Sequence, residues 1–262
     1  MRASVRLRGK PCVDEVEVDT TNFQFVLHGK RYQTDRLMLE SPVSGTVYGT
    51  LLNYKGALAA LGDAVHAEPY RFPPVAPVLY IKPVNTIIGH GMPIPLPNGI
   101  AELEVGASLG VVISRTATRV TEQRALEYVA GYTVVNDVCI PHSSYYRPAV
   151  KQRARDGFCP IGPWVIERDA VPHPDCLRLR VYINDELRQE NSTANWVRSV
   201  SRLIADVTEF MTLNAGDVLL TGVPEGAPRT KAGDRIRIEI EQVGKLENTV
   251  VPEDEWIPGG TL

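Results

Sequence analysis

The stretch AELEVGASLGVVI, residues 101–113, is the part of the sequence that most constrains the fold. From Val105 to Ile113 nearly every residue is apolar, and two glycines stand among them. A short apolar run of this length is typical of a strand that is buried on both of its faces. We therefore expect a strand here, inside a β-rich core.

Alternating apolar and polar residues predict further strands outside this run. Between Leu177 and Ile183 every second residue is apolar, and Asn184-Asp185 then has the composition of a tight hairpin turn. Shorter strand patterns occupy residues 4–9, 23–29 and 236–240. Many short strands with few helices predict a mixed β (α+β) fold rather than a parallel α/β sheet.

Two segments are predicted to be helical. Thr121 is placed to cap a short helix that contains Ala125 and Val129. A longer helix is predicted between Trp196 and Met211, where apolar residues recur at steps of three and four and form one core-facing stripe. The glycine of Asn214-Ala215-Gly216 is a signal for the end of that helix.

A proline-rich connector, residues 69–83, divides the chain in two. Its closely spaced prolines exclude a helix across it. We place a boundary near residue 75, which gives a small N-terminal β-rich region at 1–75 and a catalytic domain at 76–262.

Composition excludes several classes of protein. The net charge is −3 and the pI about 6.0, which argues against a nucleic-acid-binding protein. The N-terminus has no apolar signal-peptide segment, and no apolar window approaches the ~20 residues that span a bilayer. We expect a cytoplasmic protein without membrane or nucleic-acid partners.

Three acidic residues form the most informative constellation. Glu102 and Glu104 flank Leu103, so in a strand both carboxylates point to one face. Asp137 lies in an apolar segment, where a charge is costly unless it is paired or metal-bound. Three carboxylates without nearby Cys or His ligands favour Mg²⁺ or Mn²⁺ over zinc. The alternatives are a solvated strand edge for the two glutamates and a structural turn at Asn136-Asp137.

Several ordered motifs resemble the fumarylacetoacetate hydrolase family. Besides the E-x-E and the aspartate, the similarity rests on Tyr80-Ile81-Lys82-Pro83, on Asp156 to Pro163 (DGFCPIGP), and on Asn214 to Asp217 followed by Thr221 to Gly226 (TGVPEG). The match extends from about Gly45 to Val251. The resemblance implies a β-roll or β-sandwich catalytic domain, a homodimer, and Mg²⁺ or Mn²⁺ held by Glu102, Glu104 and Asp137.

Within the family, the sequence is most similar to the decarboxylase/isomerase branch of 4-hydroxyphenylacetate (homoprotocatechuate) degradation. The similarity lies in Tyr145 to Lys151 (YYRPAVK) and in residues 120–135. It implies metal-dependent decarboxylation, isomerisation or both, on an unsaturated 2-oxo-di- or tricarboxylate from aromatic ring cleavage. The small-molecule substrate would chelate the cation through its 2-oxo acid end, and the cation would act as a Lewis acid.

Two departures from the family pattern bear on the reaction. Hydrolases of the family often carry a His and a Glu on a short lid helix after an Asn-Tyr pair, but here Ala57 and Ala60 follow Asn53-Tyr54. Water activation by such a dyad is therefore not expected. Arg153 stands where a lysine is usual, and it keeps the charge but not the easily shifted pKa.

The remaining candidate residues are basic or polar. As catalytic residues we predict Arg153, His90 and His142; the alternative is a plain surface position for the histidines and a solvated basic face for Arg153. As substrate-binding residues we predict Arg147, Lys151, Thr221 and Gly222; for the basic residues the alternative is a solvated basic face.

Two rival functions are kept open. An acylpyruvate- or fumarylacetoacetate-type C–C hydrolase would use the same metal site but would have to activate water. A non-catalytic half of a two-subunit enzyme is the other rival, because the branch contains duplicated enzymes with diverged halves. The three clustered acids argue against the inactive half.

Overall fold

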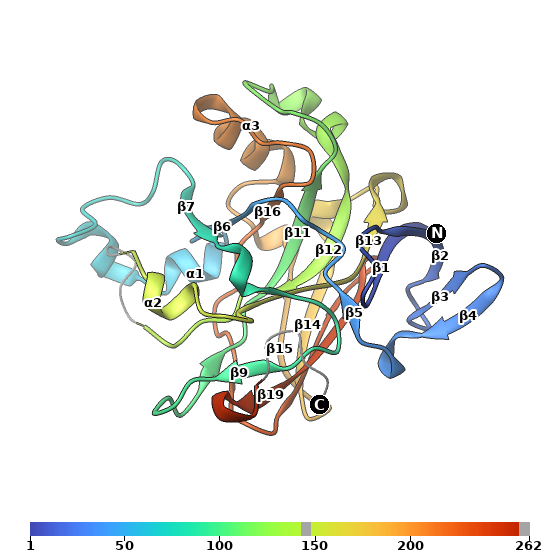
Figure 1. Ribbon diagram of the computed structural model, residues 1–262. Coiled ribbons are helices and arrows are strands. Elements are labelled where there is room, and N and C mark those ends of the chain that lie inside the picture. Colours follow the sequence, from blue (N-terminus) through green and yellow to red (C-terminus); the bar gives the residue numbers. More distant parts are fainter. Residues whose placement is uncertain (143–147, 257–262) are drawn as a thin grey trace.

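Two β-sheets that face each other form the body of the protein, as the computed structural model shows for residues 1–142 and 148–256, with Arg36 described by its backbone alone (Figure 1). The larger sheet has the strand order β4 (Lys30–Gln33), β3 (Gln24–Leu27), β2 (Asp14–Asp19), β1 (Arg2–Leu7), β13 (Cys159–Glu167), β12 (Val129–Asn136), β11 (Ala107–Ile113), β16 (Val218–Leu220), β6 (Val47–Leu51) and β7 (Val78–Lys82). Two short strands join it at the side, β5 (Leu39–Glu40) on β1 and β8 (Ile87–Ile88) on β13.

The second sheet packs against the middle of the first. Its strand order is β15 (Glu186–Ser192), β14 (Arg178–Ile183), β18 (Arg235–Ile240), β19 (Gly244–Pro252) and β9 (Ile94–Leu96). Both β18 and β19 contact β12, and β19 also contacts β13. The indole of Trp164 in β13 donates to the carbonyl of Val243 at 2.7 Å, so its polar atom is satisfied inside the interface between the sheets. The predicted mixed-β fold is confirmed.

The central strand behaves as its apolar sequence predicts. All seven residues of β11 are buried, and the strand pairs with β12 on one side and β16 on the other. Gly110 is needed in this position because a Cβ there would lie 2.9 Å from side-chain atoms of Thr133 and Val135. The strand thus anchors β10 (Leu103–Glu104), which precedes it and carries part of the candidate site.

The predicted hairpin between β14 and β15 is also confirmed. Asn184 and Asp185 have φ angles of 52° and 67°, the left-handed conformation that a type I′ turn requires at both central positions. The Asn184 side chain ties the turn to β18, since its Oδ1 accepts the backbone N–H of Arg235.

The long helix is confirmed, but its predicted end is wrong. Helix α3 (Val200–Phe210) buries Val200, Leu203, Ile204 and Val207 of the predicted stripe, but Phe210 is exposed. The Ser199 side chain caps the helix by accepting the N–H of Arg202 at 3.1 Å. The chain turns extended at Met211. Gly216 lies instead in a later turn, because the Asp217 carboxylate accepts the N–H groups of Asn214 and Thr46 there.

The predicted cap at Thr121 is wrong as well. The segment after it is the 3₁₀ helix η4 (Glu122–Tyr128), and the Thr121 side chain makes no capping hydrogen bond. The other α-helices are α1 (Lys55–Ala59) and α2 (Val150–Arg153). Further 3₁₀ turns are Thr34–Arg36, Gly62–His66, Val84–Thr86, Arg168–Ala170, Pro174–Cys176, Thr193–Asn195 and Glu253–Glu255. None of the described helices is long and apolar enough to cross a membrane.

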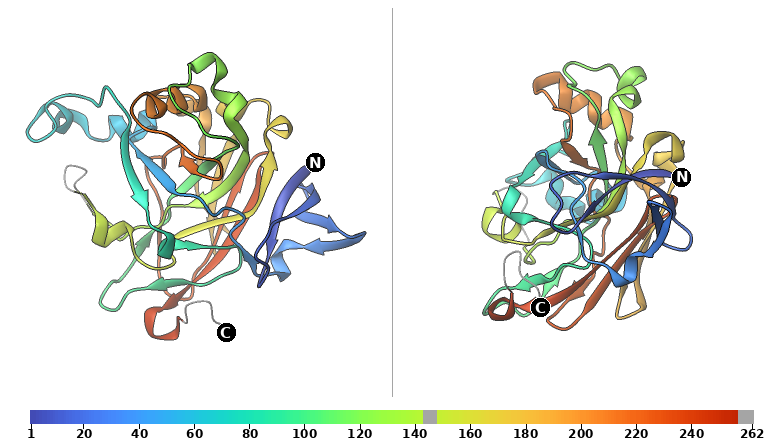
Figure 2. Two further views of the ribbon diagram at one scale, coloured as in Figure 1. Left: turned by 45° about the horizontal axis from the view of Figure 1, so that its top comes forward. Right: turned by 45° about the vertical axis from the view of Figure 1, so that its right-hand side comes forward.

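The N-terminal strands project from the body on the side away from α1 and α2 (Figure 2). They join it where β1 pairs with β13, Ala3 opposite Ile166. Strand β6 precedes the predicted boundary near residue 75, yet it pairs with β16 and β7 in the larger sheet. The boundary stays a prediction, and this pairing favours an earlier one.

Candidate active site

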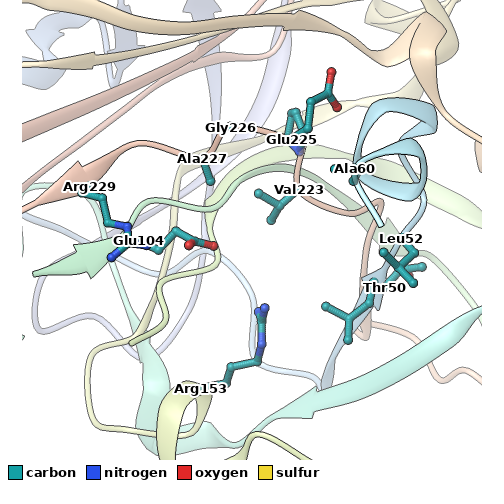
Figure 3. Close-up of a pocket in the computed structure, with 13 residues that line it drawn as sticks. Thr50, Leu52, Ala60, Glu104, Arg153, Val223, Glu225, Gly226, Ala227 and Arg229 are labelled. Carbon is teal, nitrogen blue, oxygen red and sulfur yellow. The ribbon is translucent and has the colours of Figure 1, made fainter. Parts of the chain in front are cut away.

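A pocket of about 260 Å³ opens beside β10 (Figure 3). It is enclosed by the end of β6 and helix α1, by the segment that follows Thr221-Gly222, and by α2. Glu104 and Arg153 both point into it. The lining residues are Thr50, Leu51, Leu52, Ala57, Ala60, Glu104, Arg153, Val223, Pro224, Glu225, Gly226, Ala227 and Arg229.

Backbone pairing brings Glu104 and Asp137 to one face. The N–H of Glu104 donates to the carbonyl of Cys139, and the N–H of Asp137 donates to the carbonyl of Gly106. Residues 104 and 106 therefore lie opposite 139 and 137, and strand alternation directs their side chains to the same side. Gly106 permits this close approach, because a Cβ there would lie 2.2 Å from the Asp137 carbonyl oxygen.

The Asp137 carboxylate is fully buried and surrounded by donors. Lys82 Nζ lies 2.8 Å from Oδ1, Arg153 Nη1 lies 2.8 Å from Oδ2, and the Tyr80 hydroxyl also donates to Oδ2. Burial alone would raise the pKa of Asp137, but the charges of Lys82 and Arg153 outweigh it and hold the pKa below 3.8. The carboxylate is therefore ionised at neutral pH.

Tyr80 reaches Asp137 because the neighbouring strand has no side chain at the opposing position. Gly49 in β6 pairs with Tyr80 in β7, and a Cβ on Gly49 would lie 2.0 Å from the Tyr80 ring. The Arg153 guanidinium lies over the same ring at 4.8 Å from its centre. Arg153 is thus fixed by a carboxylate on one side and an aromatic face on the other.

The three predicted metal ligands do not form one tight group. Glu102 is half exposed and pairs with Arg229 at 3.6 Å, on the rim of a neighbouring pocket. Across residues 1–142 and 148–256, no three His, Cys, Asp or Glu side chains are gathered closely enough to hold a metal ion. The chemistry of the set nevertheless fits a hard divalent cation, because all three side chains are carboxylates. In the described part of the chain, the only hydrogen bond that the Glu104 carboxylate receives is from the Cys139 thiol, at 3.8 Å.

Alanine side chains occupy the part of the pocket wall that α1 provides. Ala57 and Ala60 both line the pocket, and neither can accept a proton from water. The carboxylate of Glu225, which the sequence did not single out, lies against this helix. A Cβ on Gly56 would lie 2.1 Å from its carboxyl carbon, and Oε1 accepts from Asn191 at 3.1 Å. The sequence signal that could have pointed to Glu225 is Gly56, shortly after the family's Asn53-Tyr54 pair, because a glycine there leaves room for a side chain.

The predicted substrate-binding residues differ in where they lie relative to the pocket. Lys151 is exposed on α2, and Arg147 falls outside the described residues. Thr221 is buried, and its hydroxyl and N–H both donate to the carbonyl of Leu109. Gly222 adopts φ 103° against Asn53 and Thr50. Both precede the loop that lines the pocket, and their contact with a substrate stays a prediction.

The two predicted catalytic histidines do not line this pocket. His142 lies near the surface with Nδ1 3.0 Å from the Ile140 carbonyl. His90 is buried between the N-terminal strands and β19: Nε2 lies 3.0 Å from the Thr34 carbonyl and Nδ1 accepts the Glu247 N–H at 3.2 Å. These bonds require a neutral ring with its proton on Nε2. The catalytic roles stay predictions, and the contacts of His90 are those of a structural residue.

Acid is expected to weaken the fold through His90. Burial lowers the pKa of His90 from 6.5 to about 4. Between those values the unfolded chain takes up a proton that the folded protein does not, so the free energy of unfolding falls by about 3 kcal/mol as the pH drops from 6.5 to 4. Urea unfolding at pH 7 and pH 4.5 measures this loss, and His90→Gln should reduce it. The exposed His28 provides the control, since His28→Gln should leave the loss unchanged.

Comparison with known proteins places this fold in a family. The family model described as fumarylacetoacetate (FAA) hydrolase C-terminal matches residues 46–251. The 4-hydroxyphenylacetate degradation bifunctional isomerase/decarboxylase of Escherichia coli is 42% identical over 213 residues, which are 81% of this chain and 48% of that protein. The chain spans about half the length of the curated relatives it matches.

Solved structures agree with the sequence comparison. The 2-hydroxyhepta-2,4-diene-1,7-dioate isomerase of Mycobacterium marinum matches with a TM-score of 0.79 and 25% identity, covering 97% of this chain and all of that one. Maleylpyruvate hydrolase of Sphingobium sp. SYK-6, solved with manganese(II) and pyruvate, matches with a TM-score of 0.75 and 25% identity over 96% and 99% of the two chains. On this evidence the chain belongs to the fumarylacetoacetate hydrolase family.

Proposed function

We propose that this chain holds Mg²⁺ or Mn²⁺ through Glu102, Glu104 and Asp137 and decarboxylates or isomerises an unsaturated 2-oxo-di- or tricarboxylate from homoprotocatechuate ring cleavage. One observation carries the choice of reaction. The pocket joins Glu104 to the buried Asp137–Arg153 pair, while α1 presents only Ala57 and Ala60 to it. The names of the E. coli relative and the M. marinum isomerase support the same reaction class.

The protein's own residues have separate tasks in this reaction. A bound cation would supply Lewis-acid stabilisation of negative charge on the keto oxygen of the substrate. Arg153, held by Asp137 and the Tyr80 ring, presents a fixed positive charge beside that end of the substrate. The apolar side chains of Leu51, Leu52 and Val223 line the pocket and reduce the water in it. The lower local dielectric strengthens the electrostatic attraction between Arg153 and the substrate.

A C–C hydrolase is the second candidate, and Glu225 favours it. Glu225 lines the pocket, although Figure 3 shows its carboxylate directed away from the pocket centre. The carboxylate lies beside Gly56, and Oε2 is buried without a hydrogen bond among the described residues. Such a group could replace a missing lid base. The maleylpyruvate hydrolase structure shows that the same fold accommodates hydrolysis in another protein.

Two products measured side by side test the proposal. Purified protein with Mn²⁺ is given 5-oxopent-3-ene-1,2,5-tricarboxylate, and CO₂ release and loss of ultraviolet absorbance are followed separately. We expect measurable turnover, with acylpyruvate cleavage slower by the roughly 10²–10⁴-fold that a positioned base contributes. Efficient acylpyruvate cleavage that Glu225→Gln or His142→Ala abolishes would favour the hydrolase. No turnover of either substrate would favour the non-catalytic half.

The proposed assembly is a homodimer in the cytoplasm that acts on a small-molecule substrate. Sedimentation of the purified protein at several concentrations distinguishes a dimer from a monomer.

A further inference from the structure

Arg229 faces the pocket from a strand that the family motifs do not include. It lies in β17 (Arg229–Thr230), which pairs with β10 so that Arg229 stands directly opposite Glu104. Directly opposed residues on adjacent antiparallel strands point to the same face. Figure 3 shows the two side chains next to each other at one side of the pocket, with Arg153 pointing in from another.

Among the described residues, Arg229 and Arg153 are the two cationic residues that line this pocket. They differ in how strongly other protein groups already bind their guanidinium groups. The Arg153 side chain is 10% exposed and is bound to Asp137 at 2.8 Å. The Arg229 side chain is 52% exposed, and its ion pair with Glu102 spans 3.6 Å, longer than a hydrogen bond. The Arg229 guanidinium therefore has N–H donors to offer a ligand.

The charge of the substrate requires such a donor. Glu104, Glu225, Arg153 and Arg229 carry two negative and two positive charges on the pocket wall, and the charges of Asp137 and Lys82 beneath it also cancel. A substrate with two or three carboxylates brings further negative charge into this space. The proposed cation offsets the charge at the 2-oxo acid end, so a carboxylate at the far end needs a separate positive partner.

We propose that Arg229 binds the distal carboxylate of the substrate and so selects 2-oxo acids that carry a second acid group; this inference rests on the proposed function. A guanidinium binds a carboxylate through two parallel N–H···O bonds, which a methyl group in the same place cannot replace. Arg229 shares a face with Glu104, but its guanidinium extends toward Glu102 on the rim that the pocket shares with the neighbouring one. A substrate whose oxo-acid end lies at Glu104 can reach this guanidinium with its other end.

The test is a binding measurement with two unreactive 2-oxo acids of equal chain length. In the presence of Mn²⁺, calorimetry compares 2-oxoglutarate with 2-oxopentanoate, which has a methyl group in place of the distal carboxylate. We expect the wild-type protein to prefer 2-oxoglutarate by about 10–100-fold, and Arg229→Ala to abolish that preference while 2-oxopentanoate binds unchanged. Arg229→Lys, with one charge but no planar fork, should keep part of the preference.

Arg115→Ala is the matched control. Arg115 is 56% exposed and pairs with Glu127 at 3.4 Å, so it resembles Arg229 in exposure and pairing but lies outside the pocket. It should leave both affinities unchanged. Mn²⁺ affinity, measured by electron paramagnetic resonance, should be retained in Arg229→Ala.

Three results would overturn the inference. They are an equal affinity of the wild-type protein for the two acids, an equal loss of both in Arg229→Ala, and a loss of Mn²⁺ affinity, which would give Arg229 only the role of positioning Glu102. Failure of the proposed function is distinguished from these outcomes by the turnover assay on the wild-type protein.

Discussion

Glu104→Gln is expected to lower turnover on the order of a thousandfold while leaving the fold intact. The proposed cation contributes several kcal/mol at the transition state, and about 1.4 kcal/mol corresponds to a tenfold change in rate. Glu104 has no ion pair in the described part of the chain, so its neutralisation leaves no buried charge unpaired. The free energy of unfolding should change by less than about 0.5 kcal/mol.

Turnover and Mn²⁺ affinity are measured together on this variant. Glu186→Gln serves as the control, because Glu186 is exposed and lines the neighbouring pocket that also contains Glu102. Full activity of Glu104→Gln, or of the wild-type protein after EDTA treatment, would contradict both the metal site and the proposed reaction.

Asp137→Asn should differ from this by also destabilising the protein, by about 3–5 kcal/mol. The substitution removes the negative charge that lies 2.8 Å from both Lys82 and Arg153. The Lys82 side chain is 0% exposed, so its ammonium would lose its counter-charge in the interior. Removing one partner of a buried ion pair is more costly than removing both. Urea unfolding measures the loss.

Asp185 offers a control with the same change at the surface. It also pairs with two basic side chains, Arg235 and Arg237, but it is exposed. Asp185→Asn should cost no more than about 1 kcal/mol. The double variant Asp137→Asn/Lys82→Met should recover part of the stability that the single variant loses. Equal effects of Asp137→Asn and Asp185→Asn would show that burial does not amplify this network.

Much of the fold could be predicted because its signals are local. The apolar run of β11, the alternation in β14 and the Asn-Asp turn each depend on residues adjacent in sequence. The predicted end of the long helix was wrong because a residue distant in sequence stabilises the turn at Gly216. Asp217, for example, forms its turn partly with Thr46, which is far away in the sequence.

The site divides in the same way. Alternation along one strand predicted that Glu102 and Glu104 share a face. The same rule would have placed Tyr80 and Lys82 on one face, and in the structure both contact the buried Asp137. Arg229 and Glu225 could not be found by periodicity. β17 has two residues, and Glu225 lies in a loop, so neither gives a repeating pattern.

The pairing of β1 with β13 has a consequence for how the chain is made. Ala3 leaves the ribosome roughly 160 residues before its partner Ile166, which corresponds to about 10–30 s of synthesis at ordinary elongation rates. During that time β1 can pair with β2 and with β5, and β2 with β3, but residues 3–5 of β1 lack their β13 partner. In the nascent chain β1 therefore exposes an open strand edge, which makes it a natural client for a chaperone until β13 emerges.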